Sequence, residues 1–435
     1  MTASLAHRSR RAVWHPCSQM KQHETQPLLA VARAEGVWLY DTAGRRYLDG
    51  ISSWWVNLFG HGHPYIKAAL VAQLEQLSHV MLAGCTHEPV VELSERLGAL
   101  TGLGHAFYAS DGASATEIAL KMSAHYWRNL GRPEKTRFIG LQNGYHGETV
   151  GALSVTDIPL FRDAYGPLLR VSATVPSPDA RMAAPGVSAL EHARDCAQAL
   201  HAYLEIHHAE IAALVLEPLV QCAAGIAMHD PEYLRQARAL CDRYQVHLVA
   251  DEIAVGFGRT GSLFAHEQAG ISPDFICLSK GLTGGTMALS AVLCTDAVFD
   301  AFYDDRTVRG FLHSHSYTGN PLACRAALAT LDLFGQEDWM ARNRSTAAHL
   351  SALCEPLATH PRVKHARQLG MLWAFDIAVD DPAFARRYHA AALKRGLWLR
   401  PIGHTLYFMP PYVIDTAECA WLADGARAAL DEALQ

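Results

Sequence analysis

Two runs of apolar residues, each ending in an acid, constrain the fold of this chain most strongly. Residues 211–217 read IAALVLE and residues 246–251 read VHLVAD. Between them, Asp230 and Pro231 precede a helical pattern that includes Leu234, Ala237 and Cys241. Short apolar runs joined by an amphipathic helix are typical of neighbouring parallel strands with a right-handed connection. The pattern therefore predicts an α/β fold around a mostly parallel sheet.

A third apolar run, residues 274–279, follows closely and is succeeded by Lys280. The three predicted strands thus end at Glu217, at Asp251 and at Ser279 with Lys280 beside it. Ligands of open α/β sheets bind at the carboxyl ends of the strands. We therefore expect these polar side chains to face one crevice.

The rest of the chain suggests a large domain and a smaller one. Over residues 38–49 two short strands flank the turn at Gly44 and predict a hairpin, whereas strands alternate with helices from about Phe107 onward. Beyond about residue 328 long helices are followed by short strands. We expect residues 65–327 to form the large domain, and residues 1–64 and 328–435 to form a smaller α+β domain.

Composition and charge exclude several functional classes. The 435 residues carry a formal net charge of −6, which gives no electrostatic case for nucleic acid. No secretory signal and no apolar run long enough to cross a membrane is evident, so a cytoplasmic protein is expected. The ten cysteines include no CxxC pair, which favours buried reduced thiols, and the HxH pairs at 61–63 and 313–315 lack the further ligands of a metal site. No metal is expected.

Lys280 is the strongest candidate for a catalytic residue in this sequence. A desolvated lysine can lose its proton and attack a carbonyl, and the glycines at 281, 284 and 285 allow close approach of the backbone to a ligand. Taken alone, an ordinary solvated lysine is the favoured interpretation of this residue. Asp251 adds weight, because a carboxylate after the apolar residues 248–250 needs a cationic partner. That partner could be Arg259, a helix end or the protonated ring nitrogen of pyridoxal phosphate.

Two further segments suit such a cofactor. Residues 110–113, Ser-Asp-Gly-Ala, form a predicted strand-to-helix turn whose free N–H groups could bind phosphate, although a plain helix cap is the favoured interpretation of this segment alone. Tyr145 lies in the loop NGYHG of residues 143–147 and could stack on a flat ring or simply pack. A lysine, a ring-nitrogen acid, a phosphate turn and an aromatic side chain together are far more specific than any one of them.

With these residues in place, the sequence resembles the class III, fold-type I aminotransferases, which use pyridoxal phosphate. The segment DEIAVGFGRTG at residues 251–261, followed by Lys280, is similar to their central signature, and the resemblance runs from Trp14 to about Tyr412. Six segments further resemble the branch of the family that acts in biotin biosynthesis: WHP at 14–16, DGISSWW at 49–55, SHVM at 78–81, NGYHG at 143–147, TGGT at 283–286 and MPPY at 409–412.

The resemblance implies a role for each matching residue. In the cofactor site, Lys280 would bond to pyridoxal phosphate, Asp251 would hold its ring nitrogen, Tyr145 would stack on the ring, and Gly112 with Ala113 would bind its phosphate. Ser316 would reach the phosphate of the neighbouring subunit in a homodimer with shared sites. Arg400 would pair with a substrate carboxylate. The remaining substrate contacts would come from Trp54, Trp55, Tyr145, Lys280, Gly319 and Tyr407, with Arg259 supporting the pocket.

The same resemblance implies the reaction. An amino group would pass from S-adenosylmethionine to 8-amino-7-oxononanoate, in a ping-pong sequence by way of pyridoxamine phosphate. Lysine as donor and a different class III ω-aminotransferase are the alternatives. Three positions depart from the usual family pattern: Cys17 replaces an aromatic, Glu148 replaces an aspartate, and His315-Ser316 replaces Pro-Thr. The last of these resembles lysine-using relatives, whereas the paired Trp54 and Trp55 favour the biotin branch.

Overall fold

The computed structural model describes residues 4–26, 28–170 and 172–435. Its centre is a seven-stranded sheet in the order β4-β12-β11-β10-β7-β5-β6. Only β12 runs antiparallel to its neighbours, so the sheet is mostly parallel, as the sequence predicts. The strands are β4 (His105–Ala109), β5 (Arg137–Leu141), β6 (Ala173–Val175), β7 (Ile211–Leu216), β10 (His247–Asp251), β11 (Phe275–Leu278) and β12 (Ser290–Cys294).

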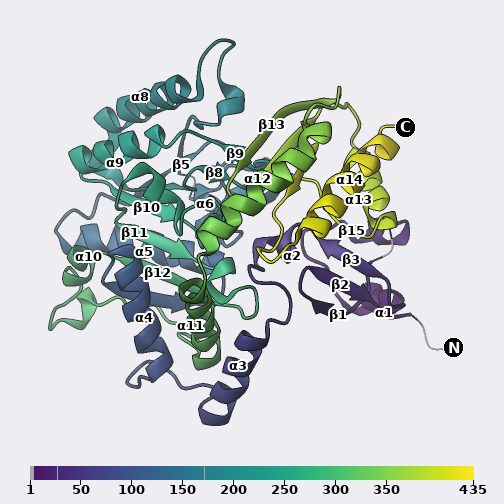
Figure 1. The fold of residues 1–435 in the computed structure, drawn as a ribbon. Coiled ribbons are helices and arrows are strands. Elements are labelled where there is room, and N and C mark those ends of the chain that lie inside the picture. Colours follow the sequence, from purple (N-terminus) through teal and green to yellow (C-terminus); the bar gives the residue numbers. More distant parts are fainter. Residues whose placement is uncertain (1–3, 27, 171) are drawn as a thin grey trace.

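Helices cover both faces of this sheet, because its central strands are apolar on both sides (Figure 1). Along β10, Leu248 and Ala250 pack into one hydrophobic cluster and Val249 between them packs into another. Helix α5 (Gly112–Asn129) covers the second face, whereas α8 (Ala189–His207) and α9 (Glu232–Tyr244) cover the first. The continuous apolar runs in the sequence thus reflect burial on two sides.

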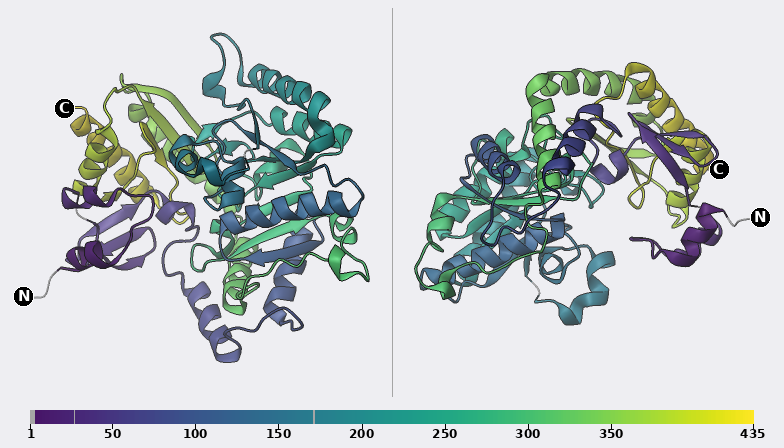
Figure 2. Two further views of the ribbon diagram at one scale, coloured as in Figure 1. Left: turned by 180° about the vertical axis from the view of Figure 1, so that it is seen from behind. Right: turned by 90° about the horizontal axis from the view of Figure 1, so that it is seen from below.

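The remaining strands form three small sheets, of which two lie at one end of the molecule (Figures 1 and 2). The predicted hairpin is confirmed as β2 (Trp38–Asp41) and β3 (Arg46–Asp49). Strand β3 pairs in parallel with β15 near the other end of the chain, so the N-terminal and C-terminal segments share a sheet. The strands of these sheets are β1 (Val31–Glu35), β2, β3 and β15 (Leu397–Trp398); β13 (Val363–Leu369), β14 (Leu372–Ile377) and β16 (Thr405–Phe408); and β8 (Val220–Gln221) with β9 (Ala227–Met228). The domain limits at residues 64 and 327 stay a prediction.

The other helices connect and cover these sheets. They are α1 (Leu5–Ala12), α2 (Ser52–Trp55), α3 (Pro64–Gln76), α4 (Glu88–Thr101), α6 (Val150–Val155), α7 (Pro159–Arg162), α10 (Asp296–Asp300), α11 (Pro321–Gln336), α12 (Trp339–Ala358), α13 (Phe384–Lys394) and α14 (Thr416–Ala433). In Figure 1, α12 runs beside β13 and α14, over the small sheets. Among the described residues, no helix combines the length and apolar character needed to span a bilayer.

The short element α2 is the most unusual part of the backbone. Four consecutive residues, from Ser52 to Trp55, have φ between 46° and 75°. L-residues adopt this left-handed conformation only at a cost, so other contacts must hold it. The buried carboxylate of Asp49 accepts hydrogen bonds from the Ser53 N–H at 2.9 Å and the Ser53 hydroxyl at 2.7 Å. This turn carries Trp54 and Trp55, two of the predicted substrate contacts.

Candidate active site

The carboxyl ends of β7, β10 and β11 meet at a cavity of about 600 Å³. Glu217, Asp251 and Lys280 line it together, which confirms the expectation that the three strand ends face one crevice. The cavity is also lined by Trp55, Ser110, Asp111, Gly112, Ala113, Tyr145, His146, Gly147, Glu148, Ile253, Gly285 and Thr286.

Lys280 lies at the start of a short helical turn directly after β11. Its φ of 42° places it in the left-handed region, where a non-glycine residue stores strain. Its Nζ lies 5.3 Å from the centre of the Trp55 ring. Burial lowers the pKa of this amine below its usual value, although the charges of Asp251, Cys222 and Glu217 oppose the shift. A lowered pKa makes the neutral, nucleophilic amine easier to reach.

Asp251 is buried and bonded to a partner that the sequence did not suggest. Its Oδ2 lies 2.7 Å from Nδ1 of His146, and its Oδ1 accepts the backbone N–H of Ile253 at 3.1 Å. Arg259, one of the partners considered, instead donates to the carbonyls of Asn57 and Pro410. Burial alone lowers the pKa of His146, but the hydrogen bond and charge of Asp251 raise it above its usual value.

Glu217 and Tyr145 form the wall beside this pair. The carboxylate of Glu217 accepts the N–H of Tyr145 at 3.1 Å and that of Cys222 at 2.9 Å. Burial, reinforced by the charge of Asp251, raises the pKa of Glu217 to about 7. The Tyr145 hydroxyl donates at 2.9 Å to Glu148, the glutamate that stands where an aspartate is usual.

The phosphate turn has the geometry of a helix start. Asp111 caps α5 by accepting the N–H of Ser114 at 2.9 Å. Helix geometry leaves the N–H groups of Gly112 and Ala113 without acceptors inside the helix, and the helix dipole favours an anion there. A Cβ on Gly147 would lie 2.5 Å from Cβ of Ala113, so only glycine lets the Tyr145 loop pack against this turn.

The residues of this cavity fit pyridoxal phosphate. Lys280 offers an amine with a lowered pKa, Asp251 offers a buried carboxylate for the ring nitrogen, and the α5 start offers donors for phosphate. In addition, Nε2 of the buried His146 has no hydrogen-bond partner among the described residues. His146 and Glu217 are absent from the predicted site residues. Their signals were present, since His146 follows Tyr145 in the glycine-bounded loop and Glu217 ends a strand.

Trp54 and Arg400 line a second cavity, of about 630 Å³, together with Cys17 and Phe161. The guanidinium of Arg400 lies 5.4 Å from the Trp54 ring and donates to the Cys17 carbonyl at 3.0 Å. Tyr145 lines the first cavity and Phe161 the second, and their rings pack edge to face with their centres 5.4 Å apart. The two cavities therefore share a wall. The left-handed turn at α2 thus places Trp54 and Trp55 in the walls of different cavities.

Three other predicted substrate or cofactor residues lie outside both cavities. Tyr407 is buried behind Trp55 and accepts its indole N–H at 3.1 Å. Gly319 is buried near Leu82, and its carbonyl accepts a hydrogen bond from His87 at 2.8 Å. Ser316 is exposed, as expected for a residue that would act in a neighbouring subunit. The chain as described brings together Lys280, Asp251, Gly112, Ala113, Tyr145 and Trp55.

A mostly parallel sheet whose strand ends bring a lysine and a buried aspartate to one pocket is the architecture of the fold-type I transferases that depend on pyridoxal phosphate. Comparison with known proteins specifies the family. The family described as "Aminotransferase class-III" matches residues 19–430. The chain belongs to this family, and it is an aminotransferase with pyridoxal phosphate as cofactor.

Relatives that match nearly the whole chain carry the same enzyme name. The adenosylmethionine-8-amino-7-oxononanoate aminotransferase of Helicobacter pylori is 44% identical over 97% of this chain and 96% of its own length. That of Geobacter sulfurreducens is 38% identical over 98% and 96%. A crystal structure of the same enzyme from Methanocaldococcus jannaschii superposes with a TM-score of 0.92 at 32% identity, covering 98% of both chains. The omega transaminase of Pseudomonas jessenii in complex with PMP gives 0.94 at 26% identity, covering 100% of this chain and 99% of that chain.

Proposed function

We propose that this enzyme transfers an amino group from S-adenosylmethionine to 8-amino-7-oxononanoate and so makes 7,8-diaminononanoate for biotin synthesis. The observation that carries the proposal is the meeting of Lys280 and Asp251 in one buried cavity. The specific substrates are supported by relatives of that name that match nearly the whole chain.

When bound, pyridoxal phosphate supplies an aldehyde that condenses with amines and a ring that accepts electrons from the adjacent carbon. Lys280 would hold the cofactor through its aldehyde, and its Nζ, once released by the donor amine, would serve as the base and acid that moves the proton of the donor's α-carbon. Asp251 would hold the ring nitrogen in its protonated form, and its bond to His146 fixes the carboxylate in place. Trp55 covers the amine and limits access of water.

Arg400 and Trp54 supply the binding site for the acceptor. The second cavity borders the first, because Tyr145 of one wall touches Phe161 of the other. A long acceptor would extend past this border, from Lys280 toward Arg400. A carboxylate at the far end of the acceptor pairs with the guanidinium of Arg400, and its carbon chain passes Trp54. Tyr407 supports Trp55 from behind through the bond to its indole N–H at 3.1 Å. The substrate contact of Gly319, which lies beside Leu82 and His87, stays a prediction.

The active enzyme is a homodimer, in which Ser316 of each subunit reaches the phosphate bound by the other. Large apolar side chains near Ser316 support this assembly, since Met81, Leu312 and Tyr317 are 60%, 76% and 62% exposed. Apolar surface of this kind is normally covered by a partner. We assign the enzyme to the cytoplasm, where its small-molecule substrates and reduced cysteines are expected.

Lysine is the alternative donor, and His315-Ser316 is the observation that favours it. The first half-reaction, between the cofactor and the donor, distinguishes lysine from S-adenosylmethionine. The purified pyridoxal phosphate form is mixed with S-adenosylmethionine or with lysine, and loss of the absorbance band of the bound cofactor shows which amine is used. Bleaching by lysine alone would overturn the proposed donor.

The acceptor is tested with Arg400→Ala. Loss of a charge-assisted pair should raise the KM for 8-amino-7-oxononanoate by roughly 10- to 100-fold. Arg427→Ala, at an exposed position of α14, is the control and should leave KM unchanged. An unchanged KM in Arg400→Ala would mean that the acceptor binds elsewhere.

A further inference from the structure

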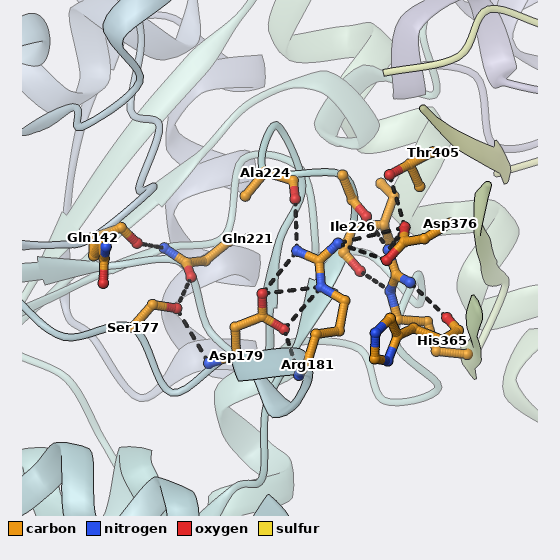
Figure 3. Close-up of polar contacts among 12 residues, drawn as sticks. Gln142, Ser177, Asp179, Arg181, Gln221, Ala224, Ile226, His365, Asp376 and Thr405 are labelled. Atoms are coloured by element: carbon orange, nitrogen blue, oxygen red, sulfur yellow. Dashed lines mark hydrogen bonds and ion pairs between the residues drawn. The ribbon is translucent and has the colours of Figure 1, made fainter. Parts of the chain in front are cut away.

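A chain of polar contacts runs from Gln142, directly before the loop of Tyr145, to Asp376 and Thr405 in the sheet of β13, β14 and β16 (Figure 3). The amide Nε2 of Gln221 donates to the carbonyl of Gln142 at 2.9 Å. On its other side, Oε1 of Gln221 accepts the hydroxyl of Ser177, and that hydroxyl accepts the N–H of Asp179 at 3.2 Å. Both Gln221 and Ser177 are only 1% exposed, so no bulk water substitutes for these bonds.

The chain continues into the sheet of β13, β14 and β16. Arg181 pairs with Asp179 at 2.7 Å and with Asp376 of β14 at 3.2 Å, so its guanidinium lies between the two carboxylates in Figure 3. Asp376 also accepts the hydroxyl of Thr405 at 2.8 Å and pairs with Arg367 at 3.0 Å. Four charged groups with alternating sign thus link the two parts of the molecule.

The two arginines hold the tip of the hairpin formed by β8 and β9. Arg181 donates to the Ala224 carbonyl at 2.9 Å, and Arg367 donates to the Ile226 carbonyl at 2.8 Å. The hairpin needs such support, since Leu219 and Ile226 both have positive φ, of 64° and 55°. Gln221 lies in β8, so its position follows from this hairpin.

The same hairpin forms the connection to the cofactor cavity. Cys222, the next residue after Gln221, donates its N–H to Glu217, and Glu217 accepts the N–H of Tyr145. The loop of residues 143–147 is therefore held at two points. Gln221 bonds to Gln142, which directly precedes the loop, and Glu217 bonds to Tyr145 within it. Both holding residues belong to the segment that runs from the end of β7 into β8.

We propose that Gln221 is a positioning residue, which fixes the wall of the cofactor cavity made by Tyr145 and Glu217. An amide suits this place, because its nitrogen donates to a carbonyl while its oxygen accepts from a hydroxyl. A leucine of similar size leaves the Gln142 carbonyl without this donor and the Ser177 hydroxyl without its acceptor. A glutamate cannot donate to Gln142 and places a buried charge near Glu217. The role in catalysis rests on the proposed function, whereas the effect on cofactor binding does not.

A double-mutant cycle distinguishes positioning from plain stability. Gln221→Leu should weaken cofactor binding and lower kcat by about tenfold each, as expected for unpaired buried groups. In a Tyr145→Ala background the same change should lower them by less than about twofold, because the side chain that it positions is gone. Ser177→Ala, which keeps the bond to Gln142, should show a smaller loss of about threefold.

Gln73→Leu is the matched control. Gln73 is a buried glutamine of α3 that donates to the Leu77 carbonyl at 3.1 Å, and it lines neither the cofactor cavity nor the second cavity. Gln73→Leu should lower the melting temperature without changing cofactor affinity.

Two outcomes would overturn the proposal. In one, Gln221→Leu lowers cofactor affinity and kcat by the same factor in the Tyr145→Ala background as in the unmodified enzyme. In the other, the folded Gln221→Leu enzyme keeps its cofactor affinity and kcat. If the unmodified enzyme bound cofactor but transferred no amino group, the proposed function would fail, and the cofactor-affinity cycle would still decide the role of Gln221.

Discussion

His146 and Asp251 form a buried pair in which Nδ1 of the imidazole lies 2.7 Å from Oδ2 of the carboxylate. The pair joins the loop after β5 to the end of β10. It gives Asp251 one fixed orientation toward the cavity and compensates the cost of burying a carboxylate. The acid assigned to the cofactor ring is thus itself positioned by a neighbour of Tyr145.

Lys280→Ala should abolish both turnover and the absorbance band of the covalently bound cofactor. The amine is the only group of this side chain that can bond to the aldehyde, and its removal also takes away the proposed base. Spectra of the purified variant with added pyridoxal phosphate test this. Survival of both properties would show that the central assignment is wrong. A chemical control is the exposed Lys67→Ala, which should retain band and turnover.

Glu217→Gln should change how stability depends on pH in the cofactor-free enzyme. The pKa of Glu217 is about 7 in the folded chain against 4.5 for an unperturbed glutamate, so the folded state binds this proton more tightly. The free energy of unfolding therefore falls as pH rises from about 4.5 to about 7, by up to ~3 kcal/mol for this group. The variant cannot titrate there, so its fall should be smaller by that amount. Denaturant unfolding at several pH values measures the difference, and parallel curves for the two proteins would contradict the prediction.

Asp49→Ala should release the left-handed turn that carries Trp54 and Trp55. The change removes both bonds to Ser53 and the 2.9 Å contact with His61, and we expect a loss of about 2–4 kcal/mol in stability with at least a tenfold loss of activity. Asp41→Ala is the matched control, because Asp41 is also buried and accepts N–H groups at 2.9 Å in the hairpin turn. The control should lose stability and keep activity once folded. Equal activity of folded Asp49→Ala and Asp41→Ala would show that activity does not depend on the left-handed turn.

Gly147→Ala should weaken cofactor binding. Gly147 has φ of +118° and no room for a Cβ beside Ala113, so the Tyr145 loop must move away from the phosphate turn. Gly131 also has positive φ, of +77°, but a Cβ there meets nothing within 4 Å. Both substitutions should cost about 1 kcal/mol in backbone strain. Only Gly147→Ala should raise the Kd for pyridoxal phosphate, by about tenfold in a fluorescence titration, and a similar Kd in both variants would count against close packing of loop and turn.

Local sequence patterns determined the elements that bear the chemistry. The apolar runs ending at Glu217 and Asp251 and before Lys280 fix three buried parallel strands, because residues buried on both faces of a sheet leave a continuous apolar signal. The polar residue that ends each run then lies at the ligand-binding edge of the sheet. Lys280 and Asp251 could be placed in one cavity for this reason, without knowledge of the order of the strands.

The tertiary structure alone decided which distant segments meet. Nothing in the sequence pairs His146 with Asp251, separates Arg400 and Trp54 into a second cavity, or places Gln221 beside Gln142. Each of these contacts joins residues far apart along the chain. A pattern of apolar and polar residues states which side of an element is buried, but the partner on that side is chosen by packing the whole chain at once.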